Sequence, residues 1–110
     1  MSKLRVIQDY EKLSTDIREQ IKLVFPEGYS NYLIEFKNRH GELVSALPFE
    51  TDDKIYMVRM SVMMAEKIIS EDADFDEDGL LKSEAKEKYK DEYADVDYLS
   101  DNENYDEEDD

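Results

Sequence analysis

The sequence lacks cysteine altogether and contains only one histidine, three glycines and two prolines in 110 residues. Without cysteine, disulfides, thiolate metal sites and cysteine nucleophiles are excluded. The single histidine, His40, precedes Gly41 and is expected in an exposed turn. The glycines are isolated, so they form no phosphate-binding loop. No catalytic constellation is visible, and we therefore expect a protein that is not an enzyme and has no cofactor.

Long apolar runs are also missing from the sequence. No stretch reaches the roughly 18 apolar residues that a transmembrane helix needs. The first residues, MSKLRVIQDYEKL, contain no apolar run typical of a secretory signal. The length suits one small domain. We expect a soluble, cytoplasmic protein that does not bind membranes.

Positive charge is scarce, with 14 Lys and Arg against 30 Asp and Glu, and the formal net charge is −16. The imbalance lies almost wholly in one part of the chain. Residues 1–70 carry 10 basic and 11 acidic side chains, whereas residues 71–110 carry 4 and 19. Blocks of like charge resist collapse and often serve as interaction tails. The distribution therefore predicts a nearly neutral body with an acidic extension.

Hydrophobic periodicity predicts the order β-α-β-β-β-α over residues 1–70. Strands are expected at 3–8, 32–38, 43–49 and 54–60, with helices at 15–25 and 61–70. Helices that cover one face of a mostly antiparallel sheet give a small two-layer α+β domain. Pro48 cannot donate to a strand ladder, so this end of the strand should lie at an edge or terminate pairing. The residues expected to face the core from the two helices are Leu13, Ile17, Ile21, Val24, Phe25, Met64, Ala65, Ile68 and Ile69.

The remaining chain divides into two expected parts. An acidic turn and an amphipathic helix should occupy 71–99, with a weakly docked stripe at Leu81, Ala85, Tyr89, Tyr93 and Val96. No periodicity remains in 100–110, which we interpret as a disordered acidic tail.

The run DADFDEDGLLKSE, at 72–84, begins like a calcium-binding EF-hand loop. Asp74, Asp76 and Asp78 would be the first three ligands, and Leu80 would offer its carbonyl. The second half departs from the pattern, because Glu84 falls one residue before the position of the closing carboxylate. We therefore favour an acidic turn that joins the body to the next helix. A weak Ca²⁺ site formed by those five residues is the alternative.

The acidic extension has tyrosines interleaved with its carboxylates. Acidic segments with spaced aromatics can bind a basic, partly apolar protein surface. We expect a basic protein partner, such as a component of nucleic-acid machinery, whereas direct nucleic-acid binding is disfavoured by the net charge. The expected contact residues are Tyr89, Tyr93, Tyr98, Asp101, Glu103, Tyr105 and Asp106. Alternatives are a nucleic-acid mimic, which needs an ordered helix over 81–99, a calcium-responsive module, and a purely solubilising tail.

The runs KLRVIQDYEKLS, IREQIKLVFPEGY and VSALPFETDDKIYMVRM, followed by an acidic end, resemble a group of small acidic proteins of Bacteroidota. Some members of that group are called DNA primases. The residues do not support primase activity, because there is no cysteine for a zinc ribbon and the chain is short for a polymerising domain. The layout of a small domain with an acidic tail is also similar to the delta subunit of bacterial RNA polymerase, although no delta motif is matched.

Overall fold

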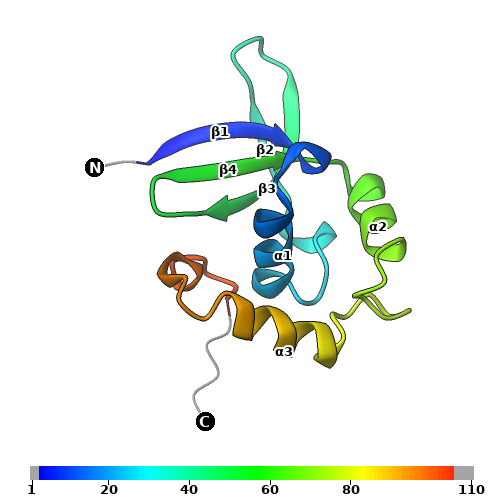
Figure 1. The fold of residues 1–110 in the computed structure, drawn as a ribbon. Coiled ribbons are helices and arrows are strands. Elements are labelled where there is room, and N and C mark those ends of the chain that lie inside the picture. The colour runs from blue at the N-terminus through cyan, green and yellow to red at the C-terminus, as the bar shows by residue number, and fades with distance from the viewer. Residues whose placement is uncertain (1–2, 106–110) are drawn as a thin grey trace.

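A four-stranded mixed sheet forms one layer of the computed structural model, which describes residues 3–105 (Figure 1). Its strands are β1 (Leu4–Asp9), β2 (Ile34–Lys37), β3 (Leu43–Glu50) and β4 (Lys54–Arg59). The spatial order is β1-β4-β3-β2. Strand β1 pairs with β4 in parallel, and the other two pairings are antiparallel. The predicted α+β class, element order and mostly antiparallel sheet are confirmed.

Strand β2 is shorter than predicted, and this shapes one edge of the sheet. Ser30–Tyr32 forms a 3-10 helix, and β2 begins at Ile34, opposite Ala46 of β3. Pro48 therefore lies past the end of β2. Its missing N–H interrupts no hydrogen bond there, as the sequence predicted for an edge position.

Helices α1 and α2 bury side chains in the same core cluster as strands β3 and β4. Helix α1 (Thr15–Val24) begins after Ser14, whose hydroxyl accepts from the Ile17 N–H at 3.3 Å. Helix α2 (Val62–Ser70) begins after Ser61, which caps it in the same way. None of the helices within residues 3–105 is long and apolar enough to cross a membrane.

The predicted inward face of α2 is partly wrong. Ala65 and Ile69 are buried, whereas Met64 is 39% exposed. Ala65 and Ile69 are four residues apart and so share one side of the helix. Met64 is rotated about 100° from Ala65, so it does not share the buried side of the helix.

The acidic extension is folded onto the body, and this corrects the expected boundary at Ser70. Helix α3 (Ser83–Glu92) packs on α1, on the side away from the sheet (Figure 1). It covers ten residues of the span 71–99 in which a turn and a helix were predicted. The buried side chains of this segment join the core of the body: Phe75, Ala85, Tyr89, Tyr93 and Leu99.

The expected disorder over 100–110 is wrong for its first six residues. A 3-10 helix spans Asp97–Asp101, and Asn102 is buried. Tyr105 packs against the core cluster as a half-buried residue. The remainder of the predicted tail, 106–110, lies outside the described residues.

Replacing Leu99 with alanine should therefore lower the free energy of unfolding by about 2–4 kcal/mol, because it opens a cavity in the core. Leu99 is 2% exposed, whereas Leu80, in the same extension, is 45% exposed. Leu80→Ala is the matched control and should cost less than about 0.5 kcal/mol. Urea denaturation followed by circular dichroism measures both. Equal, negligible losses would mean that the extension is not part of the folded unit.

Candidate functional site

The acidic loop, residues 72–82, is a compact turn anchored by its aromatic residue. Phe75 forms an isolated β-bridge with Leu81, and Gly79 makes the reversal at φ +81°. The Asp76 carboxylate accepts the N–H groups of Asp78 and Leu80 at 2.9 and 3.0 Å. Phe75 is 5% exposed and meets Tyr29 edge-on. The loop is thus fixed to the core through Phe75.

Lys22 of α1 joins this loop to α3. Its Nζ lies 2.8 Å from Oδ2 of Asp72 and 2.8 Å from Oδ2 of Asp74. The Tyr89 hydroxyl donates to the same Asp74 oxygen at 2.6 Å. We call these four residues the Lys22 cluster. It connects three segments that are far apart in the sequence.

Burial and hydrogen bonding act in opposite directions on the Lys22 cluster. Burial tends to lower the pKa of Lys22, but its bonds to Asp72 and Asp74 outweigh burial and raise that pKa. Burial tends to raise the pKa of Asp74, but bonds from Lys22 and Tyr89 lower it below the ordinary 3.8. A lowered acidic pKa stabilises the folded state above pH 3.8, and this contribution disappears as the pH falls through the folded-state value. The cluster is therefore charged and intact near neutral pH.

Two further tyrosines of the extension donate to the polar face of α1. The Tyr93 hydroxyl donates to Glu19 at 2.5 Å and lies 3.3 Å from an Asp16 oxygen. The Tyr98 hydroxyl donates to Gln20, which is only 4% exposed. Burial, followed by the bond to Glu19, raises the pKa of Tyr93 well above its usual range. The face of α1 that periodicity assigns to solvent is thus covered by the extension.

Asn102 holds the end of the extension against the free edge of β3. Its side-chain oxygen accepts the Glu50 N–H at 2.8 Å, and its amide donates to the Glu50 carbonyl at 3.1 Å. Lys3 adds a second connection, because its Nζ lies 2.8 Å from a Glu50 carboxylate oxygen and 3.4 Å from an Asp101 carboxylate oxygen. The described part of the extension is therefore held to the body at the Lys22 cluster and again at Asp101 and Asn102.

The five predicted calcium ligands do not converge in this structure. Asp74 is held within the Lys22 cluster, and Asp76 binds amides of its own loop. The Leu80 carbonyl accepts the Asp76 N–H at 2.8 Å. Asp78 and Glu84 are exposed at the surface. Calcium binding by this loop stays a prediction, and it would require several of these bonds to break.

A different group of carboxylates does converge, where α1 meets α3. Within residues 3–105 there is one such group. It consists of Asp16, Glu19 and Glu92, each of which places one carboxylate oxygen within 4.8 Å of the other two. Like charges at such distances raise the negative potential around them. This group therefore makes the boundary between the two helices strongly negative.

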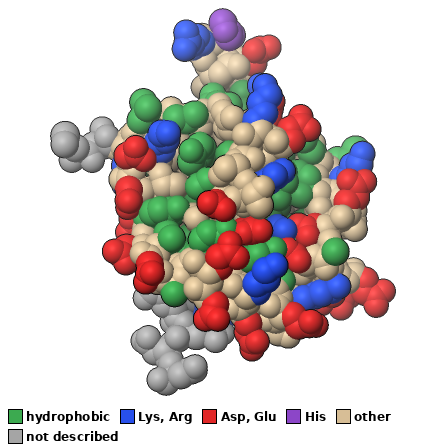
Figure 2. All heavy atoms as spheres, viewed as in Figure 1, with side chains coloured by type: hydrophobic (Ala, Val, Ile, Leu, Met, Phe, Trp, Pro, Cys, Tyr) green, Lys and Arg blue, Asp and Glu red, His purple; other side chains and the backbone are tan. Residues whose placement is uncertain are grey.

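The exposed carboxylates of residues 71–105 form what we call the acidic surface. This segment contains 14 acidic side chains, of which 11 are exposed. Figure 2 shows acidic side chains gathered around the lower part of the molecule, with a few Lys among them. Glu84, Glu87 and Asp91 recur at three- and four-residue spacing, so they project from one side of α3.

The residues predicted to contact a partner fall into separate environments. Tyr89 and Tyr93 are buried at 5% and 8% exposure, so in this folded state their rings are not available to a partner. Tyr98 and Tyr105 are half-buried, whereas Asp101 and Glu103 are exposed. Asp106 lies outside the described residues. His40, expected in an exposed turn, is exposed between β2 and β3.

Comparison of the chain with models of protein families, with curated proteins and with solved structures finds no match. The chemistry of the acidic surface is therefore the basis for a functional proposal. The resemblance to small acidic proteins of Bacteroidota stays a prediction.

Replacing Lys22 with methionine should lower the free energy of unfolding by about 2 kcal/mol, because two carboxylates lose their counter-ion. The loss should be less than for a fully buried pair, because Asp72 and Asp74 keep 18% and 28% of their side-chain exposure. Lys12→Met, at an exposed position, is the matched control and should be nearly neutral. Adding Asp74→Asn to Lys22→Met should cost less than the sum of the single changes. Strict additivity in denaturation midpoints would show that the cluster is not a unit.

Proposed function

We propose that this chain is a non-enzymatic binding protein whose acidic surface contacts a basic surface on a protein partner. One observation carries the proposal. Residues 71–105 expose 11 carboxylates, and the same segment packs its apolar side chains into the core. Surface groups that are ordered before binding lose little conformational freedom on association. The acidic surface therefore suits recognition without coupled folding.

Electrostatics favour the same type of partner. A concentration of one sign of charge accelerates encounter with an oppositely charged surface and makes the association rate salt-dependent. The converging group at Asp16, Glu19 and Glu92 adds to the potential beside α3. Recognition would rest on carboxylates and not on tyrosine rings, since Tyr89 and Tyr93 are used in the interior.

A nucleic-acid mimic is the second candidate, and the order of α3 favours it. Glu84, Glu87 and Asp91 lie along one side of the helix, with the exposed Lys88 among them. A nucleic-acid backbone also presents negative charge at regular spacing. The partner would then be a nucleic-acid-binding protein, and the two ligands would compete for its basic surface.

Replacing three of the four carboxylates of α3 with amides should abolish capture of the partner from a lysate of the cells that make this protein. The variant is Glu84→Gln/Glu87→Gln/Asp91→Asn, which changes exposed residues outside the Lys22 cluster. Glu35→Gln/Glu66→Gln/Asp53→Asn removes the same three charges from exposed positions elsewhere. Quantitative mass spectrometry should find proteins that the wild type and the control recover and the α3 variant does not.

The purified partner separates the two candidates. Its association rate should fall steeply as salt increases. If added duplex DNA displaces it from the wild-type protein, mimicry is supported, whereas a stable ternary complex supports binding without mimicry. Equal recovery by the α3 variant and its control would contradict a role for the acidic surface.

A further inference from the structure

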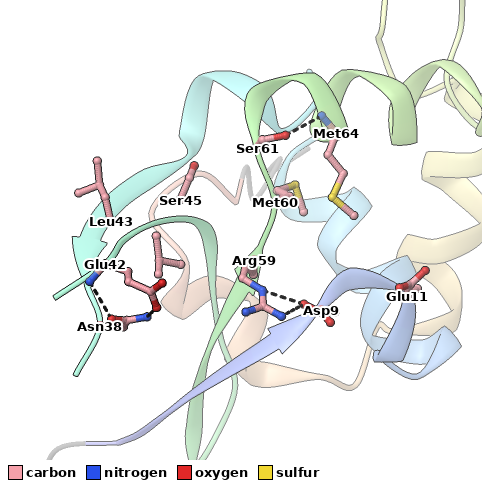
Figure 3. A pocket seen from close by; sticks show the side chains of 11 residues that line it. Asp9, Glu11, Asn38, Glu42, Leu43, Ser45, Arg59, Met60, Ser61 and Met64 are labelled. Atoms are coloured by element: carbon pink, nitrogen blue, oxygen red, sulfur yellow. Dashed lines mark hydrogen bonds and ion pairs between the residues drawn. The ribbon is translucent and has the colours of Figure 1, made fainter. Parts of the chain in front are cut away.

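A second surface lies at the other end of the molecule from α3. It is a groove of about 600 Å³ between the β2–β3 hairpin, the end of β1 and the start of α2. Figure 3 shows Met60 and Met64 along one side and Leu43 with Glu42 along the other, with the Arg59–Asp9 ion pair below them. Leu43 is 64% exposed and Met64 is 39% exposed. Met60 is buried at 2% exposure, so Leu43 and Met64 are the two apolar side chains named here that the rest of residues 3–105 leaves exposed.

One wall of the groove is an open strand edge. Pairing between β3 and β4 begins at Ala46, opposite Arg59, and the Met60 N–H then donates to the Ser45 carbonyl. Leu43 and Val44 extend past this point. The main chain of Val44 faces its partner Phe36 in β2, whereas the main chain of Leu43 faces the open side. Extended peptides bind such edges through main-chain hydrogen bonds, with side-chain pockets adding specificity.

The rim of the groove is acidic. Glu11 is exposed, and Glu42 accepts a single bond from Asn38 at 3.2 Å. The Arg59 guanidinium is already paired with Asp9 at 2.7 Å. The rim therefore complements positive charge. Residues 106–110 of the chain are all acidic, so the acidic rim disfavours their binding in the groove.

From these three features we infer that the groove binds an extended segment of another protein in which apolar residues alternate with Lys or Arg. The segment would add to the free edge at Leu43, with its apolar side chains against Leu43 and Met64. Flexible thioethers adapt to more than one apolar shape, which suits a binding groove. Its basic side chains would face Glu11 and Glu42. This surface is separate from the acidic surface, so either can exist without the other.

The test uses three short synthetic peptides that alternate Lys–Val, Lys–Ser and Glu–Val, titrated into the ¹⁵N- and methyl-labelled full chain. The Lys–Val peptide should shift the amide signals of Leu43, Val44 and Ser45 and the methyl signals of Met60 and Met64. The other two peptides should leave these signals in place at the same concentrations. Shifts confined to α3, or equal effects of Lys–Val and Lys–Ser, would overturn the proposal.

Two methionines of α2 supply a matched pair of variants. Met64→Lys should weaken Lys–Val binding tenfold or more, whereas Met63→Lys, at a side chain 80% exposed and outside the groove lining, should not. Glu11→Lys, at an exposed position, tests the rim without touching the core and should also weaken binding. Equal weakening by Met63→Lys and Met64→Lys would overturn the proposal. So would methionine shifts that depend on protein concentration without peptide, because they would assign the groove to a second copy of this chain.

Discussion

The positive charge of Lys22 is the constraint on which the architecture depends. Its side chain is largely buried between α1 and α3, where an unpaired ammonium would be strongly unfavourable. Asp72 and Asp74 supply the counter-charges, and both belong to the acidic extension. An extension that covers this lysine must therefore bring its counter-charges with it, and the loop does so. Tyr89 completes the arrangement through Asp74 and fixes where α3 lies.

This arrangement explains how a segment rich in carboxylates can join a folded core. The carboxylates that point inward are neutralised or hydrogen-bonded, by Lys22 at Asp74 and by loop amides at Asp76. The remaining carboxylates point outward and form the acidic surface. Phe75 and Leu99 provide the apolar burial that makes docking favourable. Stability and the proposed binding function thus use different carboxylates of the same segment.

The sequence predicted the body well because local patterns determine it. The serine caps of α1 and α2, the edge position of Pro48 and the apolar periodicity of Ile21 and Val24 all act over a few residues. The docking of the extension depends on pairs far apart in the sequence. Lys22 lies on a face that periodicity assigns to solvent, so nothing local indicates that Asp74 pairs with it.

The tyrosines were open to the same misinterpretation. Interleaved with acids, Tyr89 and Tyr93 are typical of partner-binding residues, yet each donates to an internal carboxylate. The helical stripe of Ala85, Tyr89 and Tyr93 was the available signal for burial. The net charge of the extension favoured an arm detached from the body over a docked segment. A count of charges does not show which carboxylates form ion pairs or hydrogen bonds inside the fold. No pattern in the sequence indicated the candidate groove, because the groove forms where β3 extends beyond the end of β4.

Native-state hydrogen exchange tests most directly whether the extension and the body are one cooperative unit. The slowest amides of α3, such as that of Tyr89, should open with the same free energy as core amides of β3, such as that of Leu47. Both should respond alike to low concentrations of denaturant. The contradicting result would be a much smaller opening free energy for α3 amides while β3 amides stay protected. The extension would then detach from the body independently, and the central role of Lys22 would be contradicted.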